Sequence, residues 1–332
     1  MNFSNDQKIE IYRDLVESRL LGEKIVEYIF SGKIAGAIHP PLGQETVCAA
    51  INNSDKISDI KTYMHPTHRM QCAQAYRVGF QPFISELLGK QGGTCGGIAG
   101  EYHLTGIEYG LLPATGGLGA AWGSDIGFAW ALKHSGKKRE VVIAPYGDGA
   151  VSQGVTYEAM NIAKLYNLPV VFLIENNGIA MSTPLSKQSP IENLADRGEA
   201  FAMKHVTVDG NDVLALTEAL LNGMELAANF EPNIIEAKNL VRWQGHYVGD
   251  RQEAYRDLTF LKDLDSIDPV LKFEKQLREE GILDDAKVEE IKKDKIDMIV
   301  AAFDVAISQE PPTKEQVLDI TRLFANPEGG EL

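Results

Sequence analysis

The sequence predicts an α/β fold with an open, mainly parallel sheet, helices on both faces of that sheet, and helical extensions at both ends of the chain. Short apolar runs with the length of buried strands alternate with helical segments in the middle of the chain. Polar turns follow two of these strands, and the first and last parts of the chain have helical patterns. With 332 residues, the chain is long enough to bury a full hydrophobic core.

The N-terminal part predicts one long helix. Apolar residues recur at helical spacing from Asn5 to about Phe30, and Ser31-Gly32 ends the segment. Shorter helices are expected over about 44–52 and 82–90, whereas residues 61–72 have no clear periodicity. The stretch from Gly89 to Gly123 is rich in glycine but too apolar for a linker, which suggests backbone that a ligand or another subunit approaches closely.

The middle of the chain predicts strand–helix–strand units. A strand over Glu140–Tyr146, a helix over about 155–166 and a strand over Pro169–Ile174 form one unit, whose two strands should be parallel neighbours. A strand over 206–208, a helix over about 213–229 and a strand over 234–240 follow. The chain is helical and charged from about Asp268. We therefore expect an N-terminal helix over 1–35, an α/β domain over 36–265, and a C-terminal helical extension over 266–332 packed on that domain.

The composition argues against several classes of protein. The net charge is −15, from 47 acidic and 32 basic residues, so neither nucleic acid nor an anionic membrane surface is expected as the main partner. No stretch approaches the roughly 20 apolar residues that a membrane helix needs. The three cysteines, Cys48, Cys72 and Cys95, have no paired spacing, which favours a reduced, cytoplasmic protein without a disulfide framework or a zinc site.

Two polar turns at strand ends predict a site for magnesium and a diphosphate. Asp148 follows one strand and Asn177 the next, so both side chains should emerge at the same edge of the sheet. Magnesium takes oxygen ligands of this kind and completes its shell with phosphate oxygens and water. The turn Gly147-Asp148-Gly149 should also leave backbone N–H groups free to face a phosphate. The alternative is structural, with a tight turn at 147–149 and a helix cap or Asx-turn at 176–177.

These turns carry a family resemblance. The run from Gly147-Asp-Gly to Glu175-Asn-Asn177 resembles the thiamine-diphosphate motif, and most closely that of the alpha subunit of the decarboxylating component of 2-oxoacid dehydrogenases, the pyruvate, branched-chain and acetoin dehydrogenases. The likeness extends from about Ile38 to Arg256. It includes the blocks His39-Pro-Pro-Leu-Gly-Gln-Glu45, Gly100-Glu-Tyr-His103, Gly110-Leu-Leu-Pro-Ala with Leu118-Gly-Ala120, and Arg242-Trp-Gln-Gly-His246 with Asp250 and Tyr255-Arg256.

The resemblance implies thiamine diphosphate and Mg²⁺ as cofactors and gives roles to individual residues. Asp148 and Asn177 would bind magnesium through side-chain oxygens, and Ile179 through its backbone carbonyl. Arg69, His68 and His246 are implied to contact the diphosphate, His246 at the mouth of the site. Gly149 and Ala150 would pack against the diphosphate. Gly110 and Leu112 would contact the aminopyrimidine through their backbone. His39 and His246 are the implied catalytic histidines, because a pKa near neutrality suits proton transfer. For each histidine taken alone, a structural role remains the alternative.

The sequence departs from the family pattern at the substrate end of the site. His68 stands where many members have tyrosine, Gln71 where the family has a histidine, Tyr247 where a serine is common, and Arg251 where a proline is usual. These departures leave the cofactor anchor intact and leave the substrate open.

The resemblance also implies a partner. Activation of the cofactor needs a glutamate on the aminopyrimidine, which two-chain members carry on a beta subunit, and no second half of that kind is recognisable here. We therefore expect a heterotetramer of two alpha and two beta subunits, with residues 89–123 and 155–166 as candidate contacts. The expected reaction is decarboxylation of a small 2-oxoacid, or cleavage of an acyloin such as acetoin, with transfer of the acyl group to a lipoyl domain of an acyltransferase. The alternatives are a split transketolase-like or acyloin-forming enzyme and a non-catalytic scaffold subunit.

Overall fold

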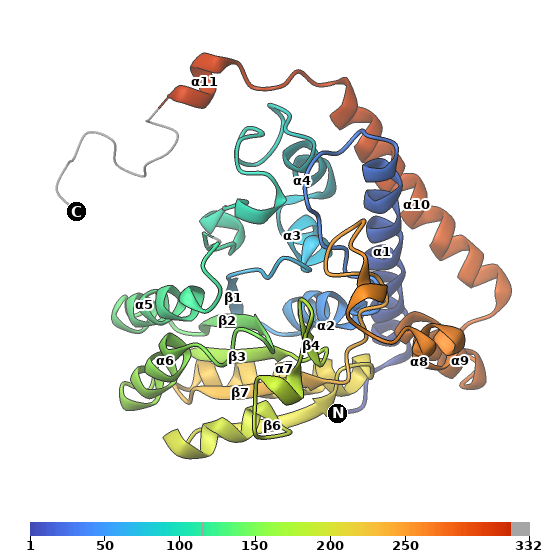
Figure 1. Cartoon of the computed structure of the whole chain (residues 1–332). Helices are drawn as coiled ribbons and strands as arrows, with labels where there is room; N and C mark the ends of the chain where they lie inside the picture. The colour runs from blue at the N-terminus through green and yellow to red at the C-terminus, as the bar shows by residue number, and fades with distance from the viewer. Residues whose placement is uncertain (114–115, 320–332) are drawn as a thin grey trace.

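A five-stranded parallel sheet forms the centre of the molecule (Figure 1). The computed structural model describes residues 1–113 and 116–319. The strand order is β1-β2-β3-β7-β6, and the strands are β1 (Lys61–Met64), β2 (Glu140–Gly147), β3 (Val170–Glu175), β6 (Lys204–Asp209) and β7 (Asn233–Lys238). All of the neighbouring pairs are parallel. The predicted α/β fold class is thus confirmed, as is the parallel pairing of the two strands in the first unit.

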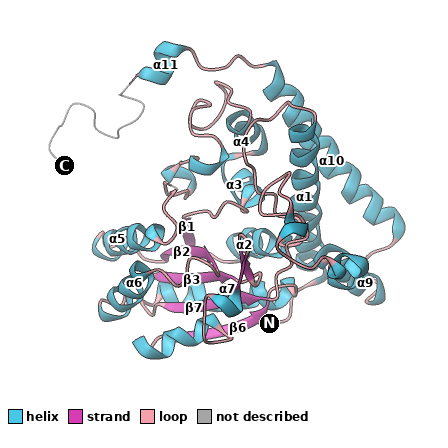
Figure 2. Ribbon diagram, viewed as in Figure 1, coloured by secondary structure: helices cyan, strands magenta, loops and turns pink. Residues whose placement is uncertain are grey.

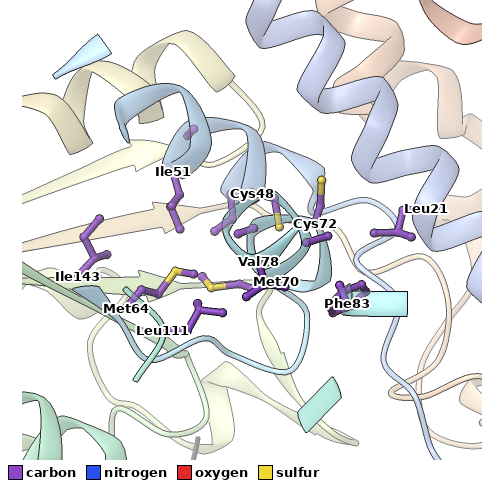
Figure 3. Close-up of a cluster of buried hydrophobic side chains, with 14 of the residues drawn as sticks. Leu21, Cys48, Ile51, Met64, Met70, Cys72, Val78, Phe83, Leu111 and Ile143 are labelled. Carbon is purple, nitrogen blue, oxygen red and sulfur yellow. The ribbon is translucent and has the colours of Figure 1, made fainter. Parts of the chain in front are cut away.

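Helices cover both faces of this sheet (Figure 2). Alternate residues of β2 and β3 face two different cores, since side chains of a strand point to opposite faces. Val141 and Ile143 join a core with α2 (Glu45–Ile57), α3 (Gln71–Val78), α4 (Phe80–Leu87) and α7 (Val213–Ala228), part of which Figure 3 shows. Val142 and Ala144 join the core on the other face with α5 (Ala120–His134), α6 (Gly154–Leu165) and the 3₁₀ segment Leu194–Phe201.

The two ends of the chain pack together beside the sheet. The long helix α1 (Asn5–Phe30) lies against α10 (Asp285–Ser308), and both also contribute to the core that α2 and α7 share (Figure 1). The N-terminal half of α1 shares a further core with α9 (Pro269–Glu279) and the start of α10. Short helices α8 (Leu264–Ile267) and α11 (Lys314–Leu318) complete the C-terminal part.

The structure contains elements that the sequence pattern did not predict. β1 lies within residues 61–72 and pairs with β2, α3 begins at the end of that segment, and α5 begins within the glycine-rich stretch. β1 has only four residues, too few for a recognisable period, and α5 contains Gly123 and Gly127, which are unfavourable in helices. Residues 114–115 of that stretch, and 320–332 of the expected C-terminal extension, lie outside the described residues.

Three smaller observations bear on the composition arguments. In the described part of the chain, no helix combines the length and the apolar character that a bilayer crossing requires. Cys48, Cys72 and Cys95 are all unpaired. Beyond β3 a short hairpin of β4 (Ile179–Ala180) and β5 (Thr183–Pro184) leads into the loop before β6.

Candidate active site

Asp148 and Asn177 lie at the same edge of the sheet. β2 and β3 are in register with Gly147 opposite Glu175, so the residues that follow both strands leave the sheet together. Gly149 packs against the hairpin beyond Asn177, because a Cβ atom at Gly149 would come within 2.3 Å of the Cβ of Ala180. The turn at 147–149 therefore contacts the hairpin that follows Asn177, and the N–H of Asp148 donates to the carbonyl of Glu175 at the end of β3 (3.0 Å).

Asp148 is a buried carboxylate with one uncommitted oxygen. Its Oδ1 accepts a hydrogen bond from the N–H of Gly149 (2.9 Å), whereas Oδ2 is buried with no partner among the described residues. Burial raises the pKa of Asp148 to about 6. A buried acceptor of this kind is costly unless something binds it, so it fits a cation ligand.

Asn177 is held in place by two neighbours. Its Nδ2 donates to Oε1 of Gln44 (2.9 Å), and its Oδ1 accepts from the N–H of Ile179 (3.2 Å). An amide oxygen has a second lone pair, so Asn177 Oδ1 can still accept or ligate. Gln44 Nε2 is buried without a partner in the described chain, and it adds a donor next to this side chain.

The expectation of free N–H groups in the 147–149 turn is wrong for the structure as described. The N–H of Gly149 donates to its neighbour Asp148, and the N–H of Ala150 donates to the carbonyl of Gly147 (2.9 Å). The turn uses these donors because a tight reverse turn closes them onto its own acceptors. A hydrogen bond from the N–H of Gly149 to a diphosphate would therefore require its bond to Asp148 to be exchanged, whereas packing of Gly149 against the diphosphate would not.

Three histidines from distant parts of the chain meet beside this edge. His39, His68 and His246 have ring nitrogens that all lie within 4.8 Å of one another. The centroid distances are 4.7 Å from His39 to His68 and 4.6 Å from His39 to His246. Burial and the charge of Arg69 lower the pKa of all three, to about 3 for His39 and about 4 for His246, so the rings are neutral near pH 7.

Two arginines surround the histidines. Arg69 is buried and donates to the carbonyls of Pro40 (3.0 Å) and His246 (2.8 Å), which ties the His39 segment to the His246 loop. Arg242 donates to the carbonyl of Met181 (2.9 Å) and lies 3.4 Å from Nδ1 of His246. Burial lowers the pKa of Arg69 to about 10, so it remains charged at neutral pH. Two guanidinium groups next to neutral histidines favour an anion over a metal ion at this cluster.

The His246 loop is fixed by Asp250. The Asp250 carboxylate accepts from the N–H of His246 (2.6 Å) and from the hydroxyl of Tyr255, which in turn lies 3.2 Å from Arg242. A side chain at Gly245 would collide with Asp250, since its Cβ would lie 2.5 Å from that of Asp250. The block from Arg242 to Tyr255 thus forms one hydrogen-bonded unit beside the histidines.

Gly110 and Leu112 lie at the end of β1. The carbonyl of Gly110 accepts from the N–H of Met64 (2.8 Å), and the N–H of Leu112 donates to the carbonyl of Met64 (2.9 Å). Gly110 has a φ of +77°, and a Cβ there would lie 2.5 Å from the carbonyl oxygen of Thr62, so only glycine fits. These backbone groups hold the loop to the sheet edge, and a contact with an aminopyrimidine ring stays a prediction.

Several buried polar residues of this region were not singled out as site residues from the sequence. They are Gln44, Glu101, Glu175 and Arg242, and with them Tyr102, which is 36% exposed. All five stand within the sequence blocks that carry the family resemblance, and that resemblance was the signal that could have identified them. Glu175 is buried next to Asp148 and Arg69, and desolvation raises its pKa to about 7.

Comparison with known proteins places the chain among enzymes of one family. A family model described as the dehydrogenase E1 component matches residues 13–315. The chain is 30% identical to the alpha subunit of an acetoin:2,6-dichlorophenolindophenol oxidoreductase from Bacillus subtilis, over 99% of this chain and 97% of that relative. It is 32% identical to the subunit of the same name from Cupriavidus necator, over 93% and 92%. It is 30% identical to the alpha subunit of the pyruvate dehydrogenase E1 component from Rhizobium meliloti, over 96% and 91%.

Proposed function

Because the chain belongs to the dehydrogenase E1 component family, we propose that it is the alpha subunit of a thiamine-diphosphate-dependent 2-oxoacid dehydrogenase component that works with a beta subunit. The observation that carries the proposal is the sheet edge where Asp148, with one unbound buried oxygen, adjoins the turn at Asn177. The alpha-subunit relatives support the partner.

The residues at this edge suit a magnesium ion and a diphosphate. We propose that Asp148 and Asn177 ligate Mg²⁺ through side-chain oxygens, with Ile179 adding its carbonyl. Arg69, His68 and His246 would hold the diphosphate, with Gly149 and Ala150 packed against it and Gly110 and Leu112 at the aminopyrimidine. The charges of Arg69 and Arg242 support this assignment, because they compensate an anion that the acidic chain as a whole would repel.

The proposed mechanism assigns proton handling to the histidines. Bound thiamine diphosphate acts as a nucleophile and electron sink when the bond next to a carbonyl breaks. His39 and His246 would direct ring N–H groups at the reacting oxygen and stabilise its developing charge by hydrogen bonds. Their lowered pKa values keep both rings neutral, so each carries one N–H donor and adds no positive charge that would repel Mg²⁺.

We propose that the beta subunit completes the active site by contributing the glutamate to the aminopyrimidine. Exposed apolar side chains on and beside α6 support a contact there, with Tyr157, Leu165 and Tyr166 between 37% and 66% exposed. The division into an N-terminal helix (1–35), a cofactor domain (36–265) and a C-terminal extension (266–332) is part of the proposal. The shared cores of α1, α9 and α10 support extensions that are packed on the domain.

The substrate proposal is a small 2-oxoacid or an acyloin such as acetoin, with a lipoyl acyltransferase as acyl acceptor and a cytoplasmic location. The acetoin and pyruvate relatives support both substrate classes. The test is to assemble the chain with its beta subunit and to titrate thiamine diphosphate with Mg²⁺ by calorimetry, then to assay 2-oxoacids and acyloins with an artificial electron acceptor. No binding by the assembled pair would overturn the cofactor assignment.

Asp148→Ala provides the sharpest check of the metal site. It should abolish Mg²⁺-dependent cofactor binding while the circular dichroism spectrum stays that of the parent protein. Asp196→Ala, an exposed carboxylate of the 3₁₀ segment before β6, is the matched control and should bind as the parent does. Unchanged affinity in Asp148→Ala would exclude Asp148 as the ligand.

A further inference from the structure

Tyr102 makes a side-chain hydrogen bond to the most buried histidine of the cluster. Its hydroxyl lies 2.9 Å from Nδ1 of His39. His39 is 6% exposed, whereas Tyr102 is 36% exposed, so the pair joins a buried ring to the surface. The Tyr102 ring also lies parallel to that of His68, at 6.1 Å between centroids and an interplanar angle of 4°.

The surrounding groups decide which of the two donates. Burial and the nearby Glu101 raise the pKa of the Tyr102 hydroxyl, so it keeps its proton. Burial, with Arg69, Arg242 and His246 on the other sides, lowers the pKa of His39 to about 3, so its ring is neutral and has one lone pair. The hydroxyl can then donate to Nδ1, its nearer ring nitrogen at 2.9 Å against 3.5 Å for Nε2, and this bond leaves the ring proton on Nε2.

Tyr102 itself is held firmly at this position. It belongs to the 3₁₀ turn Glu101–His103, whose Glu101 carbonyl accepts from Nε2 of Gln74 (3.2 Å). The loop just before it ends on Ala99 and Gly100, whose N–H groups donate to the buried carboxylate of Glu86. The carbonyl of His39 accepts from Nε2 of Gln71 (2.8 Å), so both partners are anchored through their backbone.

We infer that Tyr102 is a positioning residue for His39, which fixes the Nε2–H tautomer and connects the buried ring to solvent. When His39 gives the Nε2 proton to a substrate oxygen, Nδ1 takes the Tyr102 proton, and the hydroxyl recovers one from hydronium or a buffer acid in the solvent. His39 is then the Nδ1–H tautomer, and it returns to the Nε2–H tautomer when a proton passes back along the same path. The proton count balances, and His39 stays neutral throughout. The reaction itself rests on the proposed function, whereas the tautomer does not.

The tautomer is tested directly by nitrogen NMR on the assembled complex, with this chain labelled at its seven histidines. His39 should show a bare Nδ1 and a protonated Nε2 in the parent protein, assigned from His39→Gln. Tyr102→Phe, which keeps the ring and removes the hydroxyl, should shift the Nδ1 signal toward a mixture of tautomers. Tyr247→Phe is the matched control, since Tyr247 is similarly exposed and its ring lies 6.3 Å from His39; its His39 signals should equal those of the parent. A protonated Nδ1 in the parent, or unchanged signals in Tyr102→Phe, overturns the inference.

The proton path is tested by kinetics. Tyr102→Phe should lower kcat by roughly 10-fold or more with little change in KM, and added imidazole buffer should restore part of the loss. A purely structural role would give no rescue, and that result overturns the path. If the parent complex turns over no 2-oxoacid or acyloin, the proposed function fails, while the NMR result still decides the position of the His39 proton.

Discussion

At the scale of single residues, Glu101 is a buried carboxyl group whose ionised form the fold does not stabilise. It is 6% exposed, and neither carboxylate oxygen has a hydrogen-bond partner among the described residues. Desolvation raises its pKa from 4.5 to about 8. Nearby Gln71 has a buried carbonyl oxygen that also lacks a partner there, so a neutral Glu101 can donate to it.

This carboxyl predicts a pH-dependent loss of stability. Because the folded pKa is raised, the folded protein keeps the proton between pH 4.5 and 8, whereas the unfolded chain releases it, so the free energy of unfolding falls across this window. Glu101→Gln keeps the shape and cannot ionise. It should be more stable than the parent at pH 8 by on the order of 1–3 kcal/mol and similar at pH 4.5. Urea unfolding at both pH values measures the free energy of unfolding of Glu101→Gln and of the parent, with the exposed Glu108→Gln as control. An equal stability difference between Glu101→Gln and the parent at both pH values would contradict the prediction.

The candidate site could be predicted residue by residue only in part. Asp148 and Asn177 follow consecutive strands, so their common edge follows from the sequence alone. Arg69, His68, His39 and His246 were assigned by resemblance, and the structure brings them together. Gln44 contacts Asn177 across 133 positions, and no local pattern could reveal that pair. The departure at His68, and the neighbouring Tyr102, can be interpreted only from the structure, in which both rings contact His39.

At the scale of elements, the irregular loop after α4 has a single organising side chain. Oε2 of Glu86 accepts from the N–H groups of Cys95 (2.8 Å) and Gly97 (3.0 Å), and Oε1 accepts from those of Ala99 (2.8 Å) and Gly100 (3.1 Å). Glu86 is fully buried, so these bonds satisfy its charge. The glycine-rich sequence suggests a ligand or subunit close to the backbone. Over residues 95–100 a carboxylate of the same chain approaches the backbone closely, and a subunit contact by residues 89–123 stays a prediction.

Glu86→Gln should therefore loosen this loop. The amide keeps one acceptor oxygen and turns an N–H₂ group toward two backbone donors. The two unpaired N–H groups should lower the free energy of unfolding by about 3 kcal/mol. Hydrogen exchange of the assembled complex should accelerate at Cys95, Gly97, Ala99 and Gly100 and stay unchanged at the sheet. Gln81→Glu, a substitution near the start of α4 at a partly exposed position, is the control. Parent-like exchange at all four amides would show that the loop keeps its shape without the carboxylate.

The elements that sequence could and could not predict differ in length and in pattern. α1, with a capping box at Ser4 and Gln7, is found over the predicted residues 5–30, and β2 and β3 match their apolar runs within a residue. β1 forms because β2 offers an open edge, with Lys61 paired to Glu140, which is a tertiary cause. Short elements of this kind depend on their neighbours more than on their own residues.

At the scale of the molecule, Arg19, whose side chain is 15% exposed, joins the helical ends to the site. Arg19 of α1 donates Nε to Glu45 (2.6 Å) and makes a two-bond pair with Asp268, the N-cap of α9 (2.9 Å each). Its guanidinium lies 4.4 Å from the ring centroid of Trp243, and Glu45 accepts from the N–H of Gly43. The same group thus contacts the start of α2, the segment before the His246 loop, and the C-terminal helices.

Removal of this arginine should therefore affect the whole fold. Arg19→Met leaves the carboxylates of Glu45 and Asp268 buried without their cation, which should cost about 3–5 kcal/mol of unfolding free energy. Arg13→Met on the same helix is the matched control, because its partner Asp294 is exposed and such a pair contributes under about 1 kcal/mol. Urea unfolding of both variants gives the comparison, and adding Glu45→Gln to Arg19→Met should recover part of the loss, since one uncompensated charge is then absent. Equal stability of the two single variants would mean that the helical ends do not depend on this contact. Their packing beside the sheet would then rest on the apolar cores alone, and the His39 segment would have to be held in place by Arg69.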